Sequence, residues 1–124
     1  MTNSEHLPQP LGPYSHVQTA GNLVFCAGQL ALDADTSKPL SHLPAGEQTA
    51  IVLRNLERVL IDSGSSLGQV LKTTIYLADL SDYAEVNTVY AAVFGDHRPA
   101  RATLEVSRLL GDLAVEIDAV ATSE

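Results

Sequence analysis

One arginine, Arg101, stands in a short alternating segment that runs from Pro99 to Val106. In a β-strand, successive side chains point to opposite faces. The alternation therefore separates an apolar face from a polar face: Ala102, Leu104 and Val106 against Arg101, Thr103 and Glu105. A guanidinium stays protonated in proteins, so in the middle of a strand it needs an anionic partner or water. That partner is either a structural carboxylate or a ligand.

A second alternating segment, residues 113–121, carries two carboxylates. Its apolar residues share one face, which we expect to lie under helices, so Glu116 and Asp118 point the other way. We expect Arg101 on that same open face, beside up to three carboxylates if the two strands are neighbours. Two interpretations remain open. One is a structural ion-pair network at a subunit interface, and the other is an anion clamp with a nearby carboxylate as acid or base.

The elements that would position these groups follow as strands first and then two strand–helix alternations. The signals, in order, are a strand over 22–27 ending at Gly28-Gln29, a helix over 45–63, a strand over 70–77, a helix from Ser81 or Asp82 to Phe94, the strand of Arg101, and a strand over 113–121. Asp82 and Glu85 resemble a capping box. The second helix is expected to bury Val86, Val89, Tyr90 and Val93.

This order predicts a single α+β domain over residues 1–124, with one sheet covered on one face by two helices. Residues 1–10 are polar and contain proline, and we expect them to form a flexible or loosely ordered segment. The other sheet face mixes polar and aliphatic residues, which is typical of a surface buried against another subunit.

Composition excludes several classes of function. Fifteen acidic residues against seven basic ones give a net charge of −8, which disfavours nucleic acid as a partner. The single cysteine, Cys26, rules out an internal disulfide and fits a reducing compartment. No stretch approaches a membrane span, and the four histidines show no metal-ligand spacing. We expect a soluble cytoplasmic protein without a metal.

Several short motifs occur in a fixed order along the chain: Gly12-Pro13-Tyr14-Ser15, Ala27-Gly28-Gln29, Asn55-Leu56, Lys72-Thr73-Thr74, Asp79-Leu80, Val86-Asn87 with Tyr90, Pro99-Ala100-Arg101 and Glu116-Ile117. With these motifs the chain resembles the reactive-intermediate deaminase family, also called the Rid or YjgF-type family. The resemblance extends from Leu11 to Ala121. It is specific because several motifs match together at matching spacing.

The resemblance implies a homotrimer of chorismate-mutase-like α+β subunits, each with one mostly antiparallel sheet and two helices on one face. Clefts between adjacent subunits would hold the sites. The implied activity is cofactor-free hydrolysis of reactive 2-imino acids and their enamines, such as 2-aminoacrylate, to 2-keto acids and ammonia. The implied partner is thus a small carboxylate-bearing substrate, with no nucleic acid and no membrane.

The resemblance also assigns roles by position. Arg101 matches the arginine that binds the substrate carboxylate, and Glu116 the acid that positions or activates water. Tyr14 and Asn87 match two further site positions, while Gly28 and Thr103 match positions whose backbone lines the ligand. The chemistry is consistent, because a guanidinium meets a planar carboxylate with two parallel donors. Imine hydrolysis needs little more than positioned water and one carboxylate.

Taken singly, three of these residues have ordinary structural interpretations. Gly28 fits a bulge or a tight turn, Asn87 a structural hydrogen bond in a helix, and Tyr14 a packed tyrosine. Two positions depart from the archetypal pattern, with Ala27 in place of serine and Thr103 in place of cysteine. A different enamine, of the 2-aminomuconate or 3-aminoacrylate type, therefore stays open as substrate. A non-catalytic 2-keto-acid sensor is the alternative from another class; a ribonuclease is disfavoured by the acidic charge.

Overall fold

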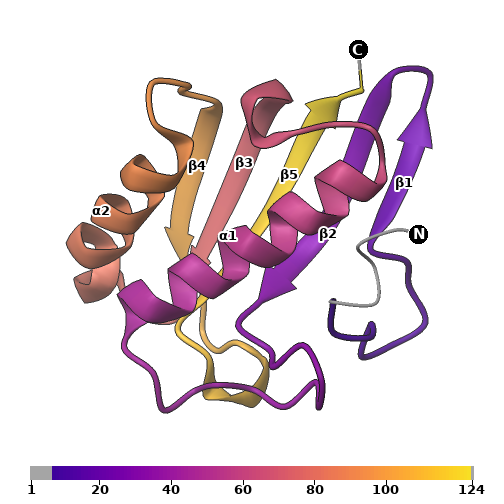
Figure 1. The fold of residues 1–124 in the computed structure, drawn as a ribbon. Helices are drawn as coiled ribbons and strands as arrows, with labels where there is room; N and C mark the ends of the chain where they lie inside the picture. The colour runs from indigo at the N-terminus through magenta and orange to yellow at the C-terminus, as the bar shows by residue number, and fades with distance from the viewer. Residues whose placement is uncertain (1–6, 124) are drawn as a thin grey trace.

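A five-stranded sheet forms the centre of the molecule, with its strands in the order β1-β2-β5-β3-β4 (Figure 1). The structure, a computed structural model, describes residues 7–123. The strands are β1 (Val17–Ala20), β2 (Leu23–Leu30), β3 (Val70–Leu77), β4 (Ala100–Glu105) and β5 (Val115–Thr122). All neighbouring pairs are antiparallel except β3 and β4, which run parallel. The two edge strands are therefore β1 and β4.

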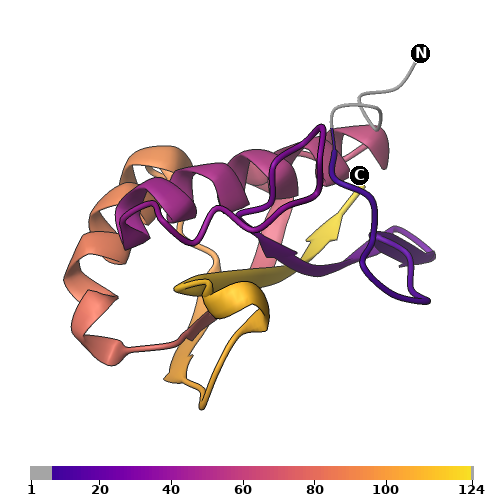
Figure 2. The ribbon, with the colours of Figure 1, turned by 90° about the horizontal axis from the view of Figure 1, so that it is seen from below.

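Two helices cover one face of this sheet and leave the other face uncovered (Figure 2). They are α1 (Ala45–Asp62) and α2 (Tyr83–Phe94), and short 3₁₀ turns η2 (Leu67–Gln69), η3 (Leu80–Asp82) and η4 (Leu110–Asp112) connect the elements. The expected α+β architecture is thus confirmed. No helix within residues 7–123 is long and apolar enough to cross a membrane.

The core lies between α1 and the central strands because two apolar patterns of different period meet there. Apolar side chains recur at helical spacing along α1, and alternate residues of β5 face them. The most deeply buried members are Val52, Leu53, Leu56 and Leu60 of α1 and Val115, Ile117 and Ala121 of β5, all 0% exposed. Burial of each large aliphatic side chain contributes about 1.5–3 kcal/mol.

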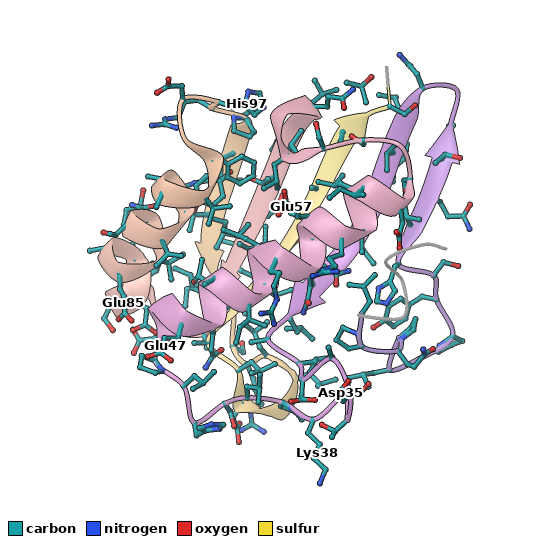
Figure 3. All side chains as sticks on the ribbon, in the orientation of Figure 1. Asp35, Lys38, Glu47, Glu57, Glu85 and His97 are labelled. Carbon is teal, nitrogen blue, oxygen red and sulfur yellow. The ribbon has the colours of Figure 1, made fainter. Side chains whose placement is uncertain are left out.

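The expected capping box at the start of α2 does not form. Asp82 has helical backbone angles and makes no side-chain cap, and the Asp79 side chain instead accepts from the backbone N–H of Ser81 at 2.8 Å. Glu85 reaches the first turn of α1, where its Oε2 accepts from the backbone N–H of Gly46 at 2.7 Å (Figure 3). A tertiary partner has therefore displaced the local one, and Glu85 caps the other helix.

The buried side of α2 follows the expectation at Val86 and Tyr90, but Val89 is only half-buried and Val93 is exposed. Val93 is 37% exposed, and Phe94 is buried in its place, with its ring centroid 4.6 Å from that of Tyr90. The helix ends over the sheet edge, where the large aromatic ring of Phe94 fills the space. Of the N-terminal segment expected to be loosely ordered, residues 1–6 lie outside the described part; Leu7 is 5% exposed.

Candidate active site

Arg101 lies on β4 with its side chain on the helix-covered side of the sheet. It pairs with Thr73 of β3, which is fully buried and whose Oγ1 is 2.7 Å from the hydroxyl of Tyr90 on α2. The guanidinium carbon lies 5.0 Å from the ring centroid of Tyr90 and 5.7 Å from that of Tyr83. Its Nη2 also donates to the Tyr83 hydroxyl at 3.2 Å. Two aromatic rings therefore hold the cation in place.

The expectation that Arg101 shares a face with Glu116 is wrong. Paired residues share a face, and Glu116 pairs with Tyr76, on the uncovered side of the sheet. Strand β3 also lies between β4 and β5, so the two strands are not neighbours. The alternation within each strand was right, but the phase of β4 was reversed. The reason is that α2 offers tyrosine rings to the guanidinium, while Ala102 and Leu104 face the uncovered side.

A structural ion-pair network at Arg101 is likewise not found. Within residues 7–123, its side-chain partners are the hydroxyl and ring of Tyr83 and the ring of Tyr90, and no carboxylate lies within ion-pair distance. The remaining N–H groups of the guanidinium make no hydrogen bond to a described residue. Arg101 is thus fixed by the two tyrosines and keeps N–H donors that could bind a carboxylate ligand.

Two tyrosines of α2 lie beside Arg101. Sequence reasoning missed Tyr83, and it noted Tyr90 as a motif residue on the buried helix side without a role in the site. Tyr83, Asn87 and Tyr90 follow one another at i, i+4 and i+7, which places them on one helix face. A hydrogen bond from Asn87 and the charge of Arg101 lower the pKa of Tyr83. Burial raises the pKa of Tyr90. The helical spacing of these polar-tipped residues was the signal that could have found them.

A cavity of about 300 Å³ opens beside this cluster. Its lining residues are Asn87, Tyr90, Ala91, Arg98, Pro99 and Arg101. Thr103 follows two residues after Arg101 on the same face of β4, and its Oγ1 is buried without a hydrogen-bond partner among the described residues. The structure therefore brings together Asn87 and Arg101 of the expected site, with Thr103 next along the strand.

Glu116 forms a second group on the uncovered face, against Gly28 of β2. A Cβ on Gly28 would collide with the carboxylate of Glu116, so the glycine lets this side chain lie flat on the β2 backbone. Burial, and secondly the charge of Asp118, raise the pKa of Glu116 above its ordinary value of 4.5. Asp118 in turn accepts a hydrogen bond from the Tyr76 hydroxyl at 2.9 Å. A raised pKa moves the carboxyl in the direction that favours a general acid or base.

A β-bulge positions Gly28, as its structural interpretation predicted. The register of β2 against β5 shifts between Cys26 and Gln29. The bulge is braced on both sides, because the backbone N–H of Ala27 donates to the His16 carbonyl at 2.8 Å and Gln29 Nε2 donates to the Ala27 carbonyl at 3.2 Å. The His16 ring bridges Gln29 and the Pro8 carbonyl, at 3.3 and 2.8 Å.

Tyr14 lies apart from both groups, in the segment before β1. It is 49% exposed, and its hydroxyl accepts from the Leu11 backbone N–H at 3.3 Å. This segment leads into the sheet edge opposite to β4. Cys26 is buried as expected, and burial raises the pKa of its thiol to about 12. No cluster of three metal-ligating side chains occurs between residues 7 and 123.

Comparison with known proteins gives a consistent result. Residues 4–123 match the family described as Endoribonuclease L-PSP. A RutC family protein of Pyrococcus abyssi is 42% identical over 121 residues, which cover 98% of this chain and 94% of that protein. The chloroplastic Reactive Intermediate Deaminase A of Arabidopsis thaliana is 42% identical over 122 residues, 98% of this chain and 65% of that protein. The crystal structure of E. coli TdcF with bound serine matches with a TM-score of 0.89 at 30% identity, covering 97% of this chain and 95% of that one.

The fold and these matches define an α+β protein of the L-PSP type. Within that class, the chain belongs to the Rid/YjgF family, as its ordered motifs indicate.

Proposed function

We propose that this protein is a cofactor-free hydrolase of reactive 2-imino acids and their enamines, which it converts to 2-keto acids and ammonia. Arg101 binds the substrate carboxylate, and Glu116 positions and activates the water. The relative named as a reactive intermediate deaminase supports the reaction class, and the relative with bound serine supports a small carboxylate-bearing ligand.

The observation that carries the proposal is the division of the site residues into two groups. The first group lies at the β4 edge on the helix-covered side and consists of Asn87, Arg101 and Thr103. The second group consists of Gly28 and Glu116 on the uncovered face and Tyr14 near the opposite edge of the sheet. The sheet separates Arg101 from Glu116 within one chain. We therefore infer a homotrimer in which each site takes Arg101 from one subunit and Glu116 from the next.

The reaction follows from this arrangement. Arg101 binds the carboxylate beside the imine carbon with two parallel N–H donors. The imine reacts with its nitrogen protonated. Glu116 removes a proton from a water as the water oxygen attacks the imine carbon, and the resulting neutral carbinolamine holds both the hydroxyl and the amino group. Glu116 then passes the proton to the nitrogen. Glu116, again a carboxylate, takes the hydroxyl proton as the carbonyl forms, and the C–N bond breaks to release ammonia.

The first test is the decay of 2-aminoacrylate generated in place by a serine dehydratase. The wild-type protein should accelerate the decay, and Arg101→Ala and Glu116→Gln should each remove the acceleration. An absence of acceleration over a panel of imines, together with 2-keto-acid binding that Arg101→Ala abolishes, would establish the sensor instead. RNA cleavage that a point variant abolishes would establish a ribonuclease.

Subunit mixing tests the shared site directly. Arg101→Ala and Glu116→Gln trimers are each inactive, but after unfolding and refolding together they should regain about a quarter of the wild-type activity, because random assembly pairs an intact Arg101 with an intact Glu116 at that fraction of the sites. The double variant refolded with wild type is the control for subunit exchange. A site built within one chain would regain nothing.

A further inference from the structure

The cavity beside Arg101 is lined by a second guanidinium, that of Arg98. The whole chain has only seven lysines and arginines against fifteen acidic residues. Two of these seven cations line the same cavity of about 300 Å³, and none of its lining residues is acidic. The cavity lining is therefore positively charged, although the chain as a whole has a net charge of −8.

Arg98 is held by the end of α2. Its Nη1 donates to the backbone carbonyls of Gly95 and His97. Carbonyls at the C-terminus of a helix have no partner within the helix and attract cations. The Nε and Nη2 groups of Arg98 make no hydrogen bond to any residue that the structure describes. Arg98 thus resembles Arg101 in being fixed by the protein while keeping free donors.

Both guanidinium charges act on the same point of the cavity wall. The hydroxyl of Tyr90 feels the charges of Arg101 and Arg98, and each lowers its pKa against the raising effect of burial. The two cations are therefore close enough to act on one small ligand. A cavity of this volume lies at the small end of the range for ligand sites, which is about 300–1,000 Å³.

We propose that the substrates of this protein are 2-imino dicarboxylates, with Arg101 on the carboxylate beside the imine carbon and Arg98 on the side-chain carboxylate. This rests on the proposed hydrolase function and names its substrate class. Oxidation of an acidic amino acid at its amino-bearing carbon is the class of reaction that supplies such imines. The second carboxylate takes no part in bond making, so the hydrolysis steps are unchanged.

The test compares imines formed in place by amino-acid oxidases from glutamate and from alanine. The wild-type protein should show a kcat/KM for the dicarboxylate imine about tenfold above that for the monocarboxylate imine, the value expected for one partly exposed charge-assisted contact. Arg98→Gln should reduce this ratio about tenfold, and Arg98→Lys should restore part of it because the charge returns. Arg108→Gln, which lies outside the cavity lining, is the matched control.

Two results would overturn this inference without overturning the proposed hydrolase function. These are equal kcat/KM values for the two imines in the wild type, and an Arg98→Gln variant that changes both values by the same factor. In either case turnover of the alanine-derived imine would leave the proposed function standing.

Calorimetric binding of the stable keto acids separates the remaining cases. Tighter binding of 2-oxoglutarate than of 2-oxobutyrate, lost in Arg98→Gln, would support the two-arginine pocket even if no imine were hydrolysed. Equal binding of the two keto acids without turnover would overturn both the inference and the proposed function.

Discussion

The carboxyl of Glu116 lies in a position that opposes its ionisation. Burial and the charge of Asp118 raise its pKa above 4.5, so the folded chain binds this proton more tightly than the unfolded chain does. The stability contributed by the protonated form is present below the ordinary pKa and is lost as the pH rises through the raised one. The carboxyl that we propose as the catalytic acid and base therefore lowers the stability of the fold at neutral pH.

Glu116→Gln should accordingly raise the melting temperature at pH 7 while removing the hydrolase activity. The gain over wild type should be smallest at the acid end of the range, since Glu116 becomes protonated in both states as the pH falls below its ordinary pKa of 4.5, and should grow as the pH rises. Thermal melts from pH 4 to pH 8 measure it. Glu57→Gln, at an exposed position of α1, is the matched control. A gain of equal size at every pH would contradict the expectation.

Gly28 is the second residue whose replacement separates activity from stability. A Cβ at this position would displace only the end of the flexible Glu116 side chain, and the backbone there is not left-handed. Gly28→Ala should therefore change the melting temperature little and lower kcat by about tenfold to a hundredfold, since misplacement of a catalytic group by about 1 Å has that effect. Gly68→Ala, where a Cβ would make only an ordinary van der Waals contact with Ser66 Oγ at 3.9 Å, is the control. A wild-type kcat in Gly28→Ala would show that the carboxylate position is not critical.

At the scale of elements, sequence periodicity predicted the strands and helices well but not which side of the sheet each strand presents. Residues 70–77 were expected as a strand, and β3 spans Val70–Leu77. An alternating strand has two possible phases, and β4 is an edge strand with a small apolar stripe, so hydrophobicity alone favoured the wrong one. The phase is decided by Tyr83 and Tyr90 of α2, which lie far from Leu104 in the sequence.

The residues of the candidate site were likewise predicted better than their arrangement in space. A guanidinium in mid-strand indicated that Arg101 needs an anionic partner or water, and the choice between a structural ion pair and a ligand stayed open. In the structure Arg101 lines a cavity, and it has no ion pair within residues 7–123. Its separation from Glu116 depends on β3 lying between β4 and β5, and strand order is not encoded in local spacing. The contact of Glu85 with Gly46 was missed for the same reason, because the local sequence offered Asp82 as a capping-box partner for Glu85.

The contact between Glu85 and Gly46 should contribute measurably to stability. Glu85→Ala leaves the backbone N–H of buried Gly46 without its acceptor and should lower the free energy of unfolding by about 1 kcal/mol, as loss of a helix cap does. Denaturant unfolding measures the change. Glu47→Ala, which removes a neighbouring acidic side chain of the same helix turn, is the control and should have a smaller effect (Figure 3). Equal losses of unfolding free energy in the two variants would mean that the removal of a negative charge, and not the loss of the cap, causes the effect.

At the scale of the whole molecule, the uncovered sheet face is the surface on which the proposed trimer would assemble. It presents exposed apolar side chains from both halves of the sheet: Leu23 and Phe25 from β2 and Leu104 from β4, which are 36%, 44% and 41% exposed. Apolar residues gathered on one face commonly mark an interface.

Leu104→Lys should therefore give a smaller species in solution and lose activity, because a lysine buried at an interface without a partner is strongly unfavourable. Light scattering coupled to size exclusion measures the mass. Ile61, at the end of α1, is similarly exposed and apolar, and Ile61→Lys should leave the mass unchanged. A wild-type mass for Leu104→Lys would remove this part of the face from the interface.

The separation of Arg101 and Glu116 by the sheet has a consequence for mixed populations of chains. In the proposed trimer every subunit serves the site on either side of it, so a subunit lacking both groups inactivates two neighbouring sites at once. A defective allele of such a protein would act as a dominant inhibitor of the intact one, and its effect would exceed its share of the chains made.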